Sequence, residues 1–125
     1  MNRTHTALKA LVALLLLACA SVAAAQPKLT HGVVTDEKGM SLYVWDNELT
    51  APGKILCTGP CTITWPPMLA KDGAKAFDGF TLMTRDDGTL QWAHQGRPLY
   101  HSANDKQPGD HKGDGFRGIW HLVKP

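Results

Sequence analysis

The sequence repeats one short pattern at a constant offset of 57 residues. Residues 39–54 read GMSLYVWDNELTAPGK, and residues 96–110 read GRPLYHSANDKQPGD. The pattern comprises a glycine, a Leu-Tyr pair, an Asn-acid pair and, after a one-residue deletion, a Pro-Gly pair. The matched residues are Gly39, Leu42, Tyr43, Asn47, Glu48 and Pro52-Gly53 in one copy and Gly96, Leu99, Tyr100, Asn104, Asp105 and Pro108-Gly109 in the other, with Trp65 and Trp120 closing the two units. Because neither half has enough apolar surface to fold alone, we expect both to share one core.

Short strands and tight turns are expected throughout the domain. Eight prolines and twelve glycines interrupt the chain, and no stretch keeps a 3.6-residue apolar period. Two β-prone runs, 81–85 and 89–93, flank Asp86-Asp87-Gly88, whose Asp-Gly pair is typical of a hairpin turn. A second hairpin follows, turning at 94–96, and its counterpart in the first half is 33–35, a turn at 36–39, and 40–45. The sequence predicts an all-β single domain of two hairpin units, about 31–67 and 88–125, joined by an exposed linker at about 70–80.

The N-terminal stretch has the composition of a secretory signal. Residues 1–25 begin with basic residues, continue in an apolar run too short to span a bilayer permanently, and end in small residues. We expect cleavage after Ala25, which leaves residues 26–125 as a periplasmic or secreted domain. The alternative is lipidation at Cys19, because residues 16–19 resemble a bacterial lipobox and would anchor the chain in the cell envelope.

Charge argues against a nucleic-acid partner. Residues 26–125 carry eleven basic and eleven acidic side chains, and no block of Lys or Arg could neutralise a row of phosphates. A membrane partner is expected only if Cys19 is lipidated. The partner is therefore an unknown envelope protein or a small ligand.

Two cysteines, Cys57 and Cys61, remain after the expected cleavage. In an oxidising compartment they should form a disulfide whose small loop stabilises the fold by roughly 2 kcal/mol on the loop-entropy model. A redox couple and a metal site are the alternatives, although a redox pair usually has two intervening residues and two thiolates do not complete a metal site. Gly59 and Pro60 suit a local turn between the cysteines.

Several motifs together resemble a known family. They are Y43-V-W-D-N-E48, C57-T-G-P-C61, W65-P-P67, R85-D-D-G-T89, P98-L-Y100, P108-G-D110 and the ending W120-H-L-V123. In this order they resemble the bacterial secreted-repeat family, predicted lipoproteins with a Y-x-[FWY]-x-x-D motif. The resemblance covers about 29–125 and implies an extracytoplasmic location and a repeat architecture. It brings no catalytic residues and no cofactor to this chain.

The two copies of that motif depart from the family pattern in different ways. The first has Glu48 in place of Asp, and the second has Ser102 where an aromatic residue is expected. Unequal copies weigh against two equivalent ligand sites, so we interpret Tyr43, Trp45 and Tyr100 as packed strand residues. We expect Glu48 and Asp105 to cap turns.

The remaining polar residues leave binding and metal chemistry open. Nothing resembles a nucleophile elbow, a phosphate loop or an H-E-x-x-H helix, so we expect a binding or interaction module without catalytic residues. The alternative is a copper-binding or redox-linked accessory protein, since histidines and methionines suit copper. In the loop 104–115, His111 with Asp110 and Asp114 are the candidate metal ligands, and the competing interpretation is a solvated loop whose Asp side chains cap backbone amides.

Overall fold

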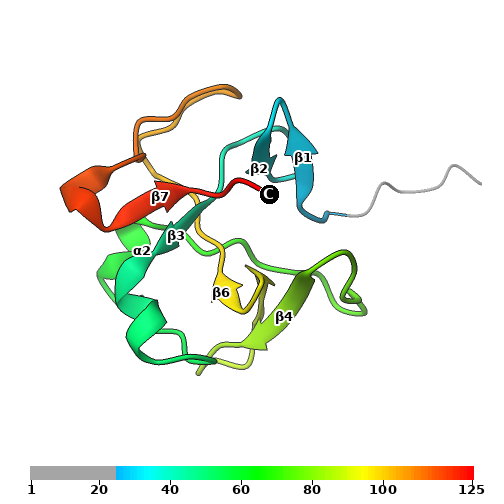
Figure 1. Ribbon diagram of the computed structural model, residues 1–125. Coiled ribbons are helices and arrows are strands. Elements are labelled where there is room, and N and C mark those ends of the chain that lie inside the picture. Colours follow the sequence, from blue (N-terminus) through cyan, green and yellow to red (C-terminus); the bar gives the residue numbers. More distant parts are fainter. Residues whose placement is uncertain (1–24) are drawn as a thin grey trace, which may run out of the picture.

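Residues 25–125 are described by a computed structural model, in which three small antiparallel sheets surround two clusters of buried side chains (Figure 1). One sheet pairs β1 (Lys28–Thr30) with β2 (Val33–Thr35), and another pairs β3 (Tyr43–Trp45) with β7 (Trp120–Leu122). The third contains β4 (Phe80–Thr84), β5 (Leu90–His94) and β6 (Arg97–Pro98). The helical elements are the short α2 (Cys61–Thr64) and the 3-10 turns η1 (Asp46–Thr50) and η2 (Phe116–Gly118).

The two hairpins predicted around the turns 86–88 and 94–96 are confirmed, because β4 pairs with β5 and β5 pairs with β6. The counterpart predicted at 33–45 forms only in part: Thr35 bridges Ser41, but β2 pairs with β1 and β3 pairs with β7. The turn between β4 and β5 is closed by a 2.8 Å hydrogen bond from the Arg85 amide to the Thr89 carbonyl, and Gly88 has a φ of 85°. Such a φ is costly for most residues other than glycine. The structure adds elements that the sequence pattern did not predict, namely β1, β7, α2 and the two 3-10 turns.

The strands of the two units pair with each other. The first unit contributes β3, which lies beside β7 of the second unit with Tyr43 opposite Leu122 and Trp45 opposite Trp120 (Figure 1). In the other half, Tyr100 of the second unit bridges Pro67 of the first. Each unit therefore donates its C-terminal segment to the Leu-Tyr strand of the other.

Hydrogen bonds repeat this exchange at equivalent positions. The Tyr43 amide donates to the Tyr100 carbonyl at 2.8 Å, and the Tyr100 amide donates to the Tyr43 carbonyl at 3.0 Å. Four bonds around the first Leu-Tyr strand each have a counterpart around the second. Those of the first are Leu42 N to Val34 O, Val34 N to Val123 O, Val123 N to Leu42 O and Asp46 N to Ile119 O. Their counterparts, in the same order, are Leu99 N to Trp92 O, Trp92 N to Met68 O, Met68 N to Leu99 O and Ala103 N to Thr64 O. The two units are thus related by an approximate twofold exchange, as in an isologous dimer.

The core is divided into two clusters, and both draw on both units. Because alternate strand residues point to opposite faces, Leu42 and Leu99 enter one cluster while Tyr43 and Tyr100 enter the other. The aliphatic cluster contains Val34, Leu42, Val44, Met68, Phe80, Trp92, Leu99 and Val123, and the aromatic cluster contains Tyr43, Cys57, Trp65, Tyr100 and Trp120. The units share buried surface as expected, but in two clusters rather than one.

Candidate functional site

The repeat-motif tyrosines and carboxylates meet across the boundary between the units. The Tyr43 hydroxyl donates to Asp105 Oδ2 at 2.7 Å, and the Tyr100 hydroxyl donates to Glu48 Oε2 at 2.7 Å. All four residues are buried. Burial raises the pKa of both tyrosines, and the carboxylate that accepts each hydroxyl adds to the rise. The packed position expected for the two tyrosines is thus what the structure shows.

The sequence predicts that Glu48 and Asp105 cap turns, and in the structure these two carboxylates do more than that. They do accept backbone amides, Leu56 N to Glu48 at 2.9 Å and Lys112 N to Asp105 at 2.9 Å, at equivalent points of the two units. Each also holds a buried hydroxyl of the other unit. Burial raises the pKa of the Glu48 carboxyl, because the charged form loses water. The expectation of a simple cap therefore understated their role.

The aromatic position of the motif is where the two copies differ. The indoles of Trp65 and Trp120 stack at 3.8 Å between centroids, and the indole of Trp45 also stacks on Trp120, at 5.2 Å between centroids. Trp45 is half-buried. Its counterpart Ser102 is buried without an aromatic ring, so the stack extends on one side only.

One glycine makes room for this stack. A Cβ atom on Gly113 would lie 2.8 Å from the Trp65 ring and 3.0 Å from the Tyr43 ring. The Gly113 amide donates to the Tyr43 hydroxyl at 3.3 Å. The equivalent region of the first unit holds the buried Cys57, so the disulfide of one unit stands where the other has a glycine.

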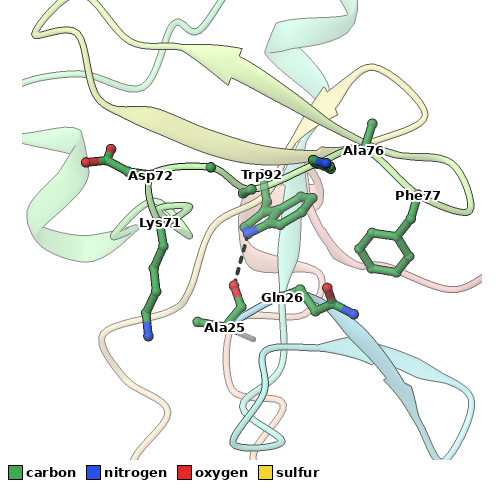
Figure 2. Close-up of a pocket in the computed structure, with 10 residues that line it drawn as sticks. Ala25, Gln26, Lys71, Asp72, Ala76, Phe77 and Trp92 are labelled. Carbon is green, nitrogen blue, oxygen red and sulfur yellow. Dashed lines mark hydrogen bonds between the residues drawn. The ribbon is translucent and has the colours of Figure 1, made fainter. Parts of the chain in front are cut away.

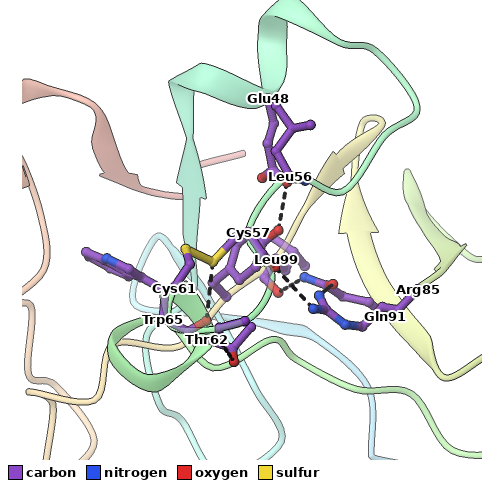
Figure 3. Close-up of a disulfide and its surroundings, with 11 residues drawn as sticks. Glu48, Leu56, Cys57, Cys61, Thr62, Trp65, Arg85, Gln91 and Leu99 are labelled. Atoms are coloured by element: carbon purple, nitrogen blue, oxygen red, sulfur yellow. Dashed lines mark hydrogen bonds between the residues drawn. A yellow bond between two sulfur atoms is a disulfide. The ribbon is translucent and has the colours of Figure 1, made fainter. Parts of the chain in front are cut away.

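The predicted disulfide is present between Cys57 and Cys61 (Figure 3). Cys57 is fully buried, and its carbonyl accepts the Arg85 guanidinium at 3.1 Å. Arg85 also donates to Gln91 at 2.6 Å, and Gln91 donates to the Leu99 carbonyl at 2.9 Å. The disulfide loop of the first unit is thereby fixed to strands of the second.

The candidate metal ligands do not converge. Asp110 accepts the amides of Lys106 and Gln107, at 2.8 and 3.2 Å, while Asp114 accepts the Leu122 amide at 3.0 Å. His111 is exposed. Within residues 25–125 no group of three or more His, Cys, Asp or Glu side chains is arranged to hold a metal ion.

A cavity of about 620 Å³ lies over Trp92 (Figure 2). Its walls are Ala25 and Gln26 on one side and residues 71–77 of the linker on the other. Trp92 is 1% exposed, and its indole N–H donates to the Ala25 carbonyl at 3.3 Å. Ala74, Ala76 and Phe77 give the cavity an apolar lining, and Lys71, Asp72 and Lys75 add charge. The predicted linker therefore forms one wall of a cavity.

Comparison with known families gives one match, over residues 81–124. This segment is similar to a family described as a secreted repeat of unknown function. The match confirms the resemblance inferred from the motifs over a segment that begins within β4, ends just after β7 and includes Tyr100 and Asp105. No curated protein and no solved structure matches the chain.

The family description places the secreted repeat outside the cytoplasm without naming a compartment. Residues 25–125 contain no helix long and apolar enough to cross a membrane. The predicted signal segment and the alternative lipidation site Cys19 lie outside the described residues.

Sequence reasoning missed the residues that are brought together only by the exchange of strands. Trp92 was expected as part of a strand, not as the floor of a cavity. Asp46 accepts His121 Nε2 at 2.8 Å and the Arg97 guanidinium at 3.1 Å, which joins residues from both units. Only the pairing of β3 with β7 would have placed Asp46 near His121, and the sequence gives no local signal for that pairing.

Proposed function

We propose that the domain is an extracytoplasmic, non-catalytic binding module, and that the cavity over Trp92 takes a small organic ligand with an apolar body. The cavity carries this proposal. Its volume of about 620 Å³ falls within the range of about 300–1,000 Å³ typical of small-molecule sites. Its lining combines an indole, a phenyl ring and alanines with a few charged groups, which is the usual composition of such a site.

The use of the repeat motif supports a role without catalysis. The two tyrosines and their carboxylate partners are buried and bonded to each other, so these groups are not free to act on a substrate. The motif supplies structure, and the cavity lies on other residues. For a copper-binding role, residues 25–125 offer no comparable cluster of ligands.

Processing of the N-terminus would change the floor of the cavity. Cleavage after Ala25, the predicted site, removes the carbonyl that accepts the Trp92 indole N–H. The indole then becomes a free donor beside the new N-terminus at Gln26, and Pro27, which is fully buried, holds that terminus in place. If Cys19 is lipidated instead, Ala25 and its carbonyl remain. We propose the first form, with residues 26–125 as the mature periplasmic or secreted domain.

A screen of the four tryptophan indole signals by ¹⁵N–¹H NMR tests the binding role. The probes are small neutral aromatic compounds, added to protein that begins at Gln26. Compounds that bind should shift the Trp92 indole signal, assigned with Trp92→Phe. The exposed cavity residue Ala76 offers a blocking variant, Ala76→Trp, and the exposed Ala103 offers a control, Ala103→Trp. We expect the first to abolish the shift and the second to preserve it. Shifts that avoid Trp92, or survive Ala76→Trp, would contradict the proposal.

A further inference from the structure

Another cavity, smaller than the one over Trp92, is lined by polar side chains that are mostly basic. It has a volume of about 180 Å³ and lies at the end of β5, the start of β6 and the C-terminal part of β7. The polar side chains that line it are those of His94, Gln95, Arg97, His121 and Lys124. None of the described residues that line it is acidic. In a domain with balanced charge, this cluster is a local excess of positive charge.

The fold holds these groups in place from several elements. His94 and Arg97 are a cross-strand pair of β5 and β6, and His121 lies on β7 opposite Val44 of β3. Asp46 is outside the cavity lining and accepts hydrogen bonds from His121 Nε2 at 2.8 Å and from the Arg97 guanidinium at 3.1 Å. These bonds lower the pKa of Asp46, with His121 the larger cause. One ionised carboxylate thus orients two of the basic groups.

Several donors remain unused in this arrangement. The buried Nε of Arg97 has no hydrogen-bond partner among the described residues. Lys124 is exposed and forms no ion pair within residues 25–125. Burial lowers the pKa of His94, so it is largely neutral at pH 7 and gains a proton, and a second donor, in acid.

We propose that this cavity binds a small oxyanion of the phosphate or sulfate class. Arg and Lys are the side chains that proteins use most to hold such groups, through a fork of N–H donors and a point charge. The two imidazoles add donors when protonated. A metal ion fits poorly, because Arg97 and Lys124 would repel it. The site is separate from the cavity over Trp92 and does not depend on the function proposed for that cavity.

Binding should strengthen as the pH falls. The charged and titratable groups around the cavity are Arg97, Lys124, His94 and His121, with Asp46 behind them. Asp46, whose pKa is lowered, stays ionised over this range. Burial lowers the pKa of His94, so this imidazole is neutral at high pH and gains a proton as the pH falls. That proton adds positive charge facing the anion.

The test is a titration of the protein with inorganic phosphate and, separately, with glycerol 3-phosphate at constant ionic strength, followed by ¹⁵N–¹H NMR. We expect shifts at His94, Arg97 and Lys124. Inorganic sulfate, whose charge is the same at both pH values, is the probe for the pH dependence and should bind more tightly at pH 5.5 than at pH 8. Preference for one probe distinguishes a free ion from a phosphate ester. Lys124→Met should weaken binding about fivefold by removing one charge, while Lys54→Met, at an exposed lysine outside the cavity, should not.

A second variant separates binding from diffuse charge effects. His94→Gln keeps a polar side chain that can donate a hydrogen bond but removes the imidazole that gains a proton in acid, so it should flatten the pH dependence. The inference is overturned if none of the probes shifts cavity signals. It is also overturned if Lys124→Met and Lys54→Met weaken binding equally, or if sulfate binds equally at both pH values.

Discussion

At the scale of single residues, each tyrosine of the repeat motif forms a hydrogen bond with an acidic residue of the other unit. Tyr43 donates to Asp105, and Tyr100 donates to Glu48. The extra methylene of Glu48 relative to aspartate is accommodated, since both hydroxyl-to-carboxylate distances are 2.7 Å. Each motif thus supplies a hydroxyl donor for the buried acid of the other motif and a carboxylate acceptor for its buried tyrosine.

A double-mutant cycle measures this pairing. Tyr43→Phe and Asp105→Asn should each destabilise the fold, and together they should show a coupling of about 1.5 kcal/mol, because a hydrogen bond to a charged group contributes about 1.5–3 kcal/mol. Urea denaturation of the four proteins gives the value. Tyr43→Phe with Glu48→Gln is the control, since these residues share a motif but no hydrogen bond, and its coupling should be below about 0.5 kcal/mol. Equal coupling in both cycles would refute the exchange.

The sequence predicted that the tyrosines are packed, but it did not predict that the carboxylates accept hydrogen bonds from their buried hydroxyls. Tyr43 and Tyr100 stand in β-prone runs, which is enough to expect a packed ring. Glu48 and Asp105 stand in turn-forming segments, where capping is the ordinary role of an acid. Their buried hydroxyl partners come from far along the chain, and no local pattern reveals them. Replacement by alanine should therefore cost more than the 1 kcal/mol or so of a lost cap.

At the scale of elements, local turns were predictable and strand partners were not. Asp-Gly in the turn between β4 and β5 sets the hairpin by its own backbone preferences, so the sequence was sufficient there. The pairing of β3 with β7 depends on segments at opposite ends of the domain. The cavity over Trp92 follows from the same kind of distant contact, between the entry to β1 and the linker. For this reason the candidate site was the least predictable part.

The disulfide is an element whose contribution should be local. Replacing both cysteines, Cys57→Ala with Cys61→Ala, should lower the free energy of unfolding by about 2 kcal/mol, as expected for a small closed loop. Because Cys57 is fully buried, Cys57→Ala also removes packed volume, and Cys57→Val with Cys61→Ala is the volume control. Urea denaturation measures all three proteins.

Alkylation of the native protein gives an independent check on the disulfide. Both sulfur atoms are bonded to each other and Cys57 is fully buried, so iodoacetamide should leave both cysteines unmodified until the protein is reduced and denatured. Mass spectrometry measures the modification. Rapid alkylation of the native protein would instead favour the redox or metal role.

At the scale of the whole molecule, the exchange of segments makes each unit depend on the other. Leu42 and Leu99 are fully buried at equivalent positions of one cluster, and each bonds through its backbone to strands of both units. The amides of Val34 and Trp92 likewise donate to carbonyls of the opposite unit, Val123 and Met68, at 2.8 and 2.9 Å. A unit that opened alone would break these bonds in both halves, so we expect neither half to be stable on its own.

Leu42→Ala and Leu99→Ala should therefore each lower stability by about 3 kcal/mol, as for a buried leucine, and in either variant the whole domain should unfold in one transition. Tryptophan fluorescence and far-UV circular dichroism should give the same urea midpoint. Hydrogen exchange adds a local readout, because the Val34 and Trp92 amides should lose protection by the same amount in both variants. An exposed alanine substitution, Leu29→Ala, is the control and should change little. If Leu42→Ala released only Val34 while Trp92 stayed protected, the units would be separable, and the exchanged strands would be contacts between two independently folded halves.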